Sequence, residues 1–145
     1  FVASQAEQFE RLPIGEFFPG FRLNALGARL AVAIEIPRPA QARGTYREFS
    51  RQPQDLALVN IAVVRTNRTV AIAVGGIDAC PVRLHEVELV AGTGGMNALK
   101  AALDDELITM KHRPVADQHG SAEYKLELAS TLIRRALVPR GNHHD

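Results

Sequence analysis

The stretch from Asp55 to Ile77 reads Asp-Leu-Ala-Leu-Val-Asn-Ile-Ala-Val-Val-Arg, then Thr-Asn-Arg-Thr, then Val-Ala-Ile-Ala-Val-Gly-Gly-Ile. Two runs rich in β-branched residues flank a short polar break, which is typical of an antiparallel hairpin. Both sides of the first run are mostly apolar, so we expect other parts of the protein to cover both of its faces. The stretch therefore predicts the central hairpin, at about residues 56–77, of a small sheet.

The elements around this hairpin are ordered as strands first and helices afterwards. Residues 30–36 and 45–49 read as further strands. Apolar residues at helical spacing begin at Leu84, at Met96 and at Tyr124. This order predicts an α+β fold in which a small antiparallel sheet packs against a group of about three C-terminal helices.

Local signals refine these boundaries. Gly75 and Gly76 allow a bulge or a close approach of the backbone after the second strand of the hairpin. Ser121 is a predicted N-cap of the last helix, with Glu123 in its first turn. Arg134 and Arg135 lie in the last turn of that helix, where cations are favoured.

Composition limits the classes of function. The chain has 145 residues, 46% hydrophobic and 23% charged, with a net charge of +1, so it is an ordinary globular chain without a basic field for nucleic acid or a membrane surface. We find no apolar run of about 18 residues that would span a bilayer and no signal peptide. The single cysteine, Cys80, fits a reducing compartment, so we expect a cytoplasmic protein.

Both ends of the chain are unusual. The first residue is Phe1 rather than methionine, so we expect a processed product or a piece of a longer protein. Residues 1–29 are broken by proline and glycine, and their phenylalanines are too numerous to stay exposed, so this segment is expected to pack against something. Residues 139–145 read as a disordered tail or a scar of protease cleavage and tagging.

Residue chemistry alone reveals no catalytic set and no metal site. Gly92 to Gly95 is interpreted as a loop between helices, because a phosphate-binding loop would follow a strand. The histidines lack the spacing of metal ligands, and Cys80 lacks a visible base. The acidic run 104–106 reads as a solvated helix face.

Five segments then occur in one order along nearly the whole chain. They are Leu12-Pro-Ile-Gly-Glu-Phe-Phe-Pro-Gly-Phe-Arg22, Leu30-Ala-Val-Ala-Ile-Glu-Ile-Pro37, Tyr46-Arg-Glu-Phe-Ser-Arg51 with residues 54–60, residues 70–76 with Pro81-Val-Arg83, and Gly120-Ser-Ala-Glu-Tyr124 with Arg134-Arg-Ala-Leu137. Together they resemble the FAD-binding (medium) subunit of molybdenum hydroxylases, of the xanthine dehydrogenase and carbon monoxide dehydrogenase type. The first segment resembles the xanthine dehydrogenase branch slightly more than the carbon monoxide dehydrogenase branch.

The resemblance implies a domain plan and a role. Residues 1–29 would be the end of a FAD-binding domain, and residues 30–138 the C-terminal domain of the flavoprotein subunit. In such enzymes a molybdenum cofactor on a large subunit hydroxylates the substrate, and iron–sulfur clusters on a small subunit carry electrons to FAD and on to an acceptor. The family's glycine-rich pyrophosphate loops have no counterpart here, so FAD would be bound largely by an upstream domain, and the isolated chain is expected to be inactive.

The resemblance also implies which residues contact the flavin. Ala31 and Val32 would pack on the isoalloxazine ring, and Arg47 would stand near the ring, where a positive charge favours reduced anionic flavin. Gly27-Ala28-Arg29 departs from the family pattern of a proline and an acidic residue before the strand. The alternative is that Ala31 and Val32 are only sheet core and Arg47 only a surface charge.

Two rival functions stay open at this point. One is a non-catalytic interaction module that docks partner subunits through its helices and residues 9–21, without contacting the flavin. The other is an unrelated domain that binds a small phosphate ligand at Gly92 to Gly95.

Overall fold

The computed structural model describes residues 2–5, 8–93, 95–109 and 120–137. The chain forms two units, Phe1–Pro39 and Ala40–Asp145, and each is described by itself below. The predicted tail, residues 139–145, and four of the five histidines lie outside the described residues; these are His112, His119, His143 and His144.

The first unit contains a small antiparallel sheet that the sequence did not predict. Strands β1 (Val2–Gln5), β2 (Gln8–Arg11) and β3 (Leu30–Ala33) pair in the order β2-β1-β3. Helix α1 (Ile14–Phe17) follows β2. The strands β1 and β2 escaped prediction because each has only four residues and few β-branched ones, and because β1 also pairs with the distant strand β3.

The division between the units falls later than the predicted domain boundary. β3 pairs with β1 and belongs to the first unit, whereas the sequence assigned residues from 30 onwards to the C-terminal domain. Pro37 and Pro39 follow this strand, and residues 31–40 are all exposed. The assignment of residues 1–29 and 30–138 to two domains of the family stays a prediction.

The second unit contains the predicted central hairpin. Strands β4 (Arg43–Phe49), β5 (Val59–Arg65), β6 (Val70–Gly75) and β7 (Val82–Arg83) form an antiparallel sheet in sequence order. The polar break closes the β5–β6 hairpin, because the Thr66 hydroxyl accepts hydrogen bonds from the amides of Arg68 and Thr69, at 3.2 and 3.0 Å.

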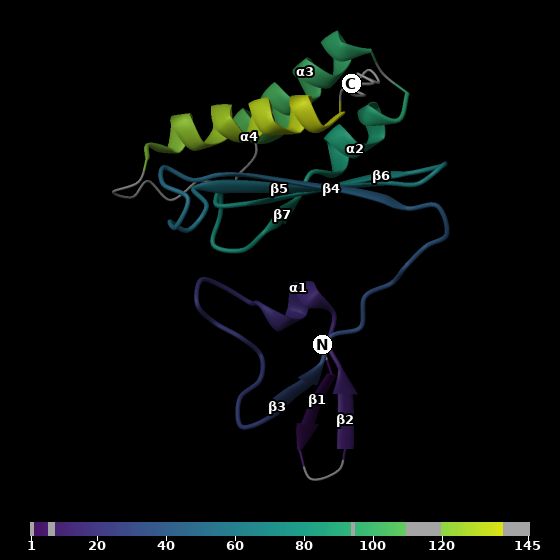
Figure 1. The fold of residues 1–145 in the computed structure, drawn as a ribbon, viewed down its shortest axis with the longest axis vertical. Helices are drawn as coiled ribbons and strands as arrows, with labels where there is room; N and C mark the ends of the chain where they lie inside the picture. The colour runs from purple at the N-terminus through teal and green to yellow at the C-terminus, as the bar shows by residue number, and fades with distance from the viewer. Residues whose placement is uncertain (1, 6–7, 94, 110–119, 138–145) are drawn as a thin grey trace. The chain divides into compact units, whose positions relative to one another are not determined.

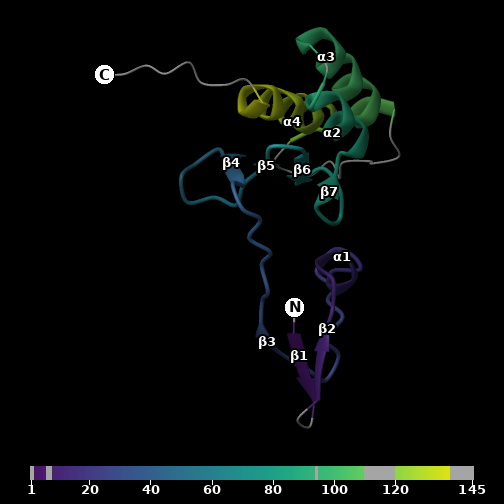
Figure 2. The same ribbon diagram turned by 90° about the vertical axis from the view of Figure 1, so that its right-hand side faces the viewer.

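Helices cover one face of this sheet. They are α2 (His85–Ala91), α3 (Met96–Asp104) with the π-helical turn η1 (Asp105–Thr109), and α4 (Ala122–Leu137). Figures 1 and 2 show them on the same side of β4 to β7. The predicted α+β fold, a small antiparallel sheet against C-terminal helices, is confirmed. The predicted cap is also confirmed, since the Ser121 hydroxyl accepts the amide of Tyr124 at 3.2 Å.

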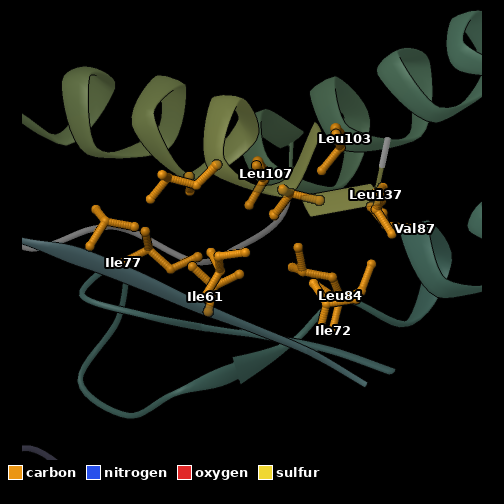
Figure 3. Packing of buried hydrophobic residues seen from close by; sticks show 14 of the residues in the cluster. Ile61, Ile72, Ile77, Leu84, Val87, Leu103, Leu107 and Leu137 are labelled. Atoms are coloured by element: carbon orange, nitrogen blue, oxygen red, sulfur yellow. The ribbon is translucent and has the colours of Figure 1, made fainter. Parts of the chain in front are cut away.

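The hydrophobic core lies between the sheet and the helices (Figure 3). Alternate residues of β5 and β6, including Ile61 and Ile72, are fully buried against helical residues such as Leu103 and Ile133. The opposite face of the hairpin is not covered in this unit, because Ala62 is exposed and Val64 is 39% exposed. Within this unit, the expectation that both faces are covered holds for one face only.

Gly76 makes the close backbone approach that the sequence indicated. Its φ angle is +88°, and a Cβ atom built there would lie 2.3 Å from the carbonyl oxygen of Leu58. A side chain would therefore be strained by both the backbone angle and the contact. This glycine lets the chain leave β6 directly beside the start of β5.

Two carboxylates fix α2. Glu106 is 3% exposed and accepts the amide of Val87, at 2.8 Å, in the first turn of α2. The prediction that residues 104–106 form a solvated face is thus wrong for Glu106, because an unpaired helix N-terminus offers a buried carboxylate its hydrogen-bond donors. Glu88 accepts two bonds from Arg83, at 2.7 Å each, and one from the amide of Ile72 at 2.7 Å.

Candidate functional site

The first two predicted flavin contacts, Ala31 and Val32, lie on β3 of the first unit. Both are exposed, Val32 to 46%. Ala31 pairs with Ala3, and the register with β1 shifts next to this pair. Successive side chains of a strand point to opposite faces, so only one of the two side chains can face a ring lying on one side of β3.

The third predicted contact, Arg47, lies on β4, an edge strand of the sheet in the second unit. It pairs with Ile61, and directly opposed residues in an antiparallel pair project from the same face. Because Ile61 is fully buried under the helices, the Arg47 side chain starts from the helix-covered face. Its Nε atom is buried and has no hydrogen-bond partner among the described residues.

The three predicted residues therefore fall into two groups. Ala31 and Val32 are neighbours in the first unit, and Arg47 belongs to the second unit. Each group is defined within its own unit, so whether the two groups share one ligand stays a prediction.

The other face of the second sheet carries a surface that sequence reasoning missed. We call it the open face; it contains Tyr46 and Glu48 of β4, Ala62 and Val64 of β5, and Ala71 and Ala73 of β6. Tyr46 is 59% exposed. The alanine side chains in the middle of this face are small, so the Tyr46 ring is the largest apolar group on it. The signal was present in the sequence as the alternation of Tyr46 with Arg47.

A hydrogen bond holds the Tyr46 ring in place. Its hydroxyl donates to the Glu48 carboxylate at 2.9 Å. This bond to the carboxylate, together with partial burial, raises the pKa of Tyr46 above its usual value. The phenol therefore stays protonated at neutral pH, and the ring presents a neutral aromatic surface.

Two further features that the sequence singled out are the Gly92 to Gly95 segment and Cys80. The segment from Gly92 to Gly95 joins α2 to α3, as predicted, so it does not follow a strand as a phosphate loop would. Cys80 is half-buried. Within the described ranges, no group of three or more His, Cys, Asp or Glu residues is placed to hold a metal ion, and no helix is both long and apolar enough to cross a membrane.

The fold and these surfaces agree with a family match. Residues 44–139, more than half of the chain, match the model of the CO dehydrogenase flavoprotein C-terminal domain. The chain belongs to this family, and the resemblance read from the sequence is confirmed.

Two named relatives share significant sequence identity with the chain. The chain is 32% identical over 132 residues to the nicotine 6-hydroxylase medium subunit of Paenarthrobacter nicotinovorans, covering 87% of this chain and 46% of that protein. It is 29% identical over 136 residues to the carbon monoxide dehydrogenase medium chain of Hydrogenophaga pseudoflava, with 87% and 46% covered. The chain thus spans about half the length of the curated relatives that it matches.

Solved structures show the same fold. Carbon monoxide dehydrogenase from Hydrogenophaga pseudoflava aligns with a TM-score of 0.78 and 26% identity, over 93% of this chain and 50% of that one. Quinoline 2-oxidoreductase from Pseudomonas putida 86 aligns with a TM-score of 0.81 and 21% identity, over 94% and 50%. The second likeness concerns the fold alone.

Proposed function

We propose that this chain is part of the flavoprotein subunit of a molybdenum-containing hydroxylase or dehydrogenase in the cytoplasm. It would help to frame FAD and dock a molybdenum-binding large subunit and an iron–sulfur small subunit. Electrons would pass from the iron–sulfur clusters through FAD to the final acceptor. The observation that carries the proposal is the family match over residues 44–139, supported by relatives that are named as medium subunits.

In this proposal Arg47, Ala31 and Val32 contact the isoalloxazine ring, and the pyrophosphate is bound by another part of the subunit. When bound, FAD accepts electrons and passes them on. Arg47 offers a cation with a buried Nε that lacks a partner among the described residues, and such a donor is stabilised by an acceptor on a ligand. On β3, Ala31 and Val32 are both exposed. We therefore assign most of the FAD-binding free energy to an upstream domain.

The first test is addition of FAD to this chain followed by gel filtration. We expect no stoichiometric flavin spectrum in the protein peak and no dehydrogenase activity, because the pyrophosphate-binding loops are missing. Tight one-to-one retention of FAD would contradict the assignment of the main FAD site to an upstream domain.

A second candidate function is a non-catalytic module that only docks partner subunits. Exposed aromatic side chains in the first unit favour it, since Phe9 is 66%, Phe18 40% and Phe21 69% exposed. Buried aromatic anchors dominate many protein interfaces, so these rings suit a partner surface.

The two functions differ in what Arg47 does. In the full-length complex, Arg47→Ala is expected to lower the flavin reduction potential and slow turnover if the arginine acts on FAD, because a nearby cation favours the reduced anionic flavin. Arg68→Ala, at an exposed position of the β5–β6 turn, is the matched control and should change neither. An unchanged potential in Arg47→Ala would favour the docking module.

The xanthine dehydrogenase branch and the domain plan are also part of this proposal. Only the sequence pattern of residues 12–22 supports the assignment to the xanthine dehydrogenase branch. A reading frame that continues upstream of Phe1, beside genes for molybdenum and iron–sulfur subunits, would support the domain plan.

A further inference from the structure

Three arginines meet where α4 ends above β4 and β5 (Figure 2), and we call them the arginine corner. Arg43 begins β4, Arg65 ends β5, and Arg135 lies in the last turn of α4. Arg43 and Arg65 are direct cross-strand partners. Arg65 also donates to the carbonyls of Ala136 and Leu137, so its guanidinium reaches the residue next to Arg135. The corner therefore joins the sheet and the helical layer of the second unit.

The segments that form the corner carry no carboxylate. Residues 40–47, 61–77 and 128–137 contain no aspartate or glutamate, although the whole chain has 16 acidic residues. Within the part of the chain that the structure describes, Arg43 and Arg135 form no ion pair, and both are exposed. The positive charge of the corner is thus local, and the net charge of +1 does not reveal it.

The pairing of Arg43 with Arg65 opposes folding. Like charges directly opposite each other on neighbouring strands destabilise a sheet. Arg65 has a structural reason to lie there, because its guanidinium binds the carbonyls at the end of α4 and opposes the negative end of the helix dipole. Arg43 has no such contact among the described residues. An anion from outside the chain would offset the repulsion between the two side chains.

The arrangement favours a ligand with several carboxylates. A guanidinium binds a carboxylate through two parallel hydrogen bonds. The three arginines come from three elements in two layers, so their charge is spread over a surface, and an extended ligand can contact all of them where one small anion cannot. The corner has no aromatic side chain on which nucleic-acid bases would stack. An acidic protein segment therefore fits it better than a nucleic acid.

We propose that the arginine corner docks an acidic segment of a partner protein. Carboxylates of that segment pair with Arg43, Arg65 and Arg135 and relieve the repulsion among them. The corner belongs wholly to the second unit, and this interaction does not depend on the proposed electron-transfer role.

Three anionic probes test the proposal on the full chain. They are capped hexaglutamate, tripolyphosphate and hexathymidylate, which stand for an acidic protein segment, a free phosphate compound and a nucleic acid. Binding is followed by amide chemical shifts of the ¹⁵N-labelled chain. We expect hexaglutamate to bind most tightly, with shifts centred on residues 41–45, 63–67 and 133–137, and to be released in about 1 M salt, which screens exposed charges. Tighter binding of either phosphate probe, shifts elsewhere, or no shift would overturn the proposal.

Paired variants separate the corner from the total charge of the chain. Arg43→Gln combined with Arg135→Gln should weaken hexaglutamate binding about ten-fold, because two exposed ion pairs of modest strength are lost. Arg22→Gln combined with Arg38→Gln removes the same charge from exposed positions of the first unit and should leave the affinity nearly unchanged. An equal loss in the two double variants would show a general charge effect and overturn the proposal.

Thermal unfolding without a probe tests whether Arg43 instead has a structural role. Arg43→Gln should unfold at the same temperature as the wild type or a higher one, because a like-charge pair is removed. A lower unfolding temperature together with unchanged hexaglutamate binding would mean that Arg43 supports the fold and not a partner, and would also overturn the proposal.

Discussion

Single residues fix the geometry where β5, β6 and α2 meet. Gly76 lets the end of β6 pass the Leu58 carbonyl, and Glu88 joins Arg83, the backbone of Ile72 and α2. Both residues are polar or small, so their importance follows from contacts between distant segments and not from hydrophobicity.

Gly76→Ala should destabilise the fold strongly. The new Cβ would meet the Leu58 oxygen at 2.3 Å with φ at +88°, and a residue held in such a conformation costs about 1–3 kcal/mol before the clash is counted. Gly92→Ala is the control, because its Cβ would meet nothing within 4 Å and its φ is −83°. Urea unfolding compares the two, and an equal midpoint for both variants would contradict the argument.

Glu88→Gln should destabilise the protein in a pH-dependent way. Burial alone would raise the pKa of Glu88, but hydrogen bonds from Arg83 and the Ile72 amide, with the charges of Arg83 and His85, lower it below the usual value of 4.5. A lowered carboxyl pKa adds stability above the unfolded value, and this stability is lost as the pH falls through the folded pKa.

The difference between wild type and Glu88→Gln is therefore expected to reach about 1–3 kcal/mol near neutral pH and to shrink below about pH 4. Glu86→Gln, exposed on the same helix, should show neither effect. Denaturant unfolding between neutral pH and about pH 3 measures the difference in unfolding free energy between the two proteins. A difference that stays constant at all pH values would refute the role of the charge.

At the scale of elements, α4 is tied at both ends. Ser121 caps its start, and Arg65 of β5 donates to the carbonyls of Ala136 and Leu137 at its end, at 3.2 and 2.5 Å. A cation at a helix C-terminus satisfies free carbonyls and opposes the negative end of the helix dipole. The two bonds from Arg65 hold the end of α4 against β5.

Arg65→Gln should loosen the end of α4. We expect a loss of about 1–2 kcal/mol, since both a charge at a helix terminus and a partly buried hydrogen bond are removed. Arg68→Gln, on the exposed hairpin turn, should change stability much less. Thermal unfolding gives the stabilities and hydrogen exchange of the last turn of α4 gives the location; unchanged exchange there would show that Arg65 does not anchor the helix.

For the whole molecule, the main property is the division into two units. Every residue of the hydrophobic core cluster, from Leu58 to Leu137, lies in the second unit. The first unit contributes only Phe17 to the buried hydrophobic residues among those described. The second unit therefore has the means to fold by itself.

Removal of residues 1–39 should leave a cooperative unfolding transition with a nearly unchanged midpoint, because every residue of the core cluster is kept. Calorimetry of the shortened and full chains makes the comparison. A shortened chain that shows no cooperative transition would mean that the first unit completes the core of the second.

The sequence by itself determined the β5–β6 hairpin, the three later helices, the Ser121 cap and the family, because these depend on local periodicity, capping chemistry and a collinear set of motifs. Only the tertiary structure decided which face of the hairpin is buried, since both faces are apolar in the sequence and the helices cover one. It also placed Arg47 on the helix side with a buried Nε and turned Glu106 inward to cap α2. Such arrangements join residues that are distant in the chain, and no local pattern encodes them.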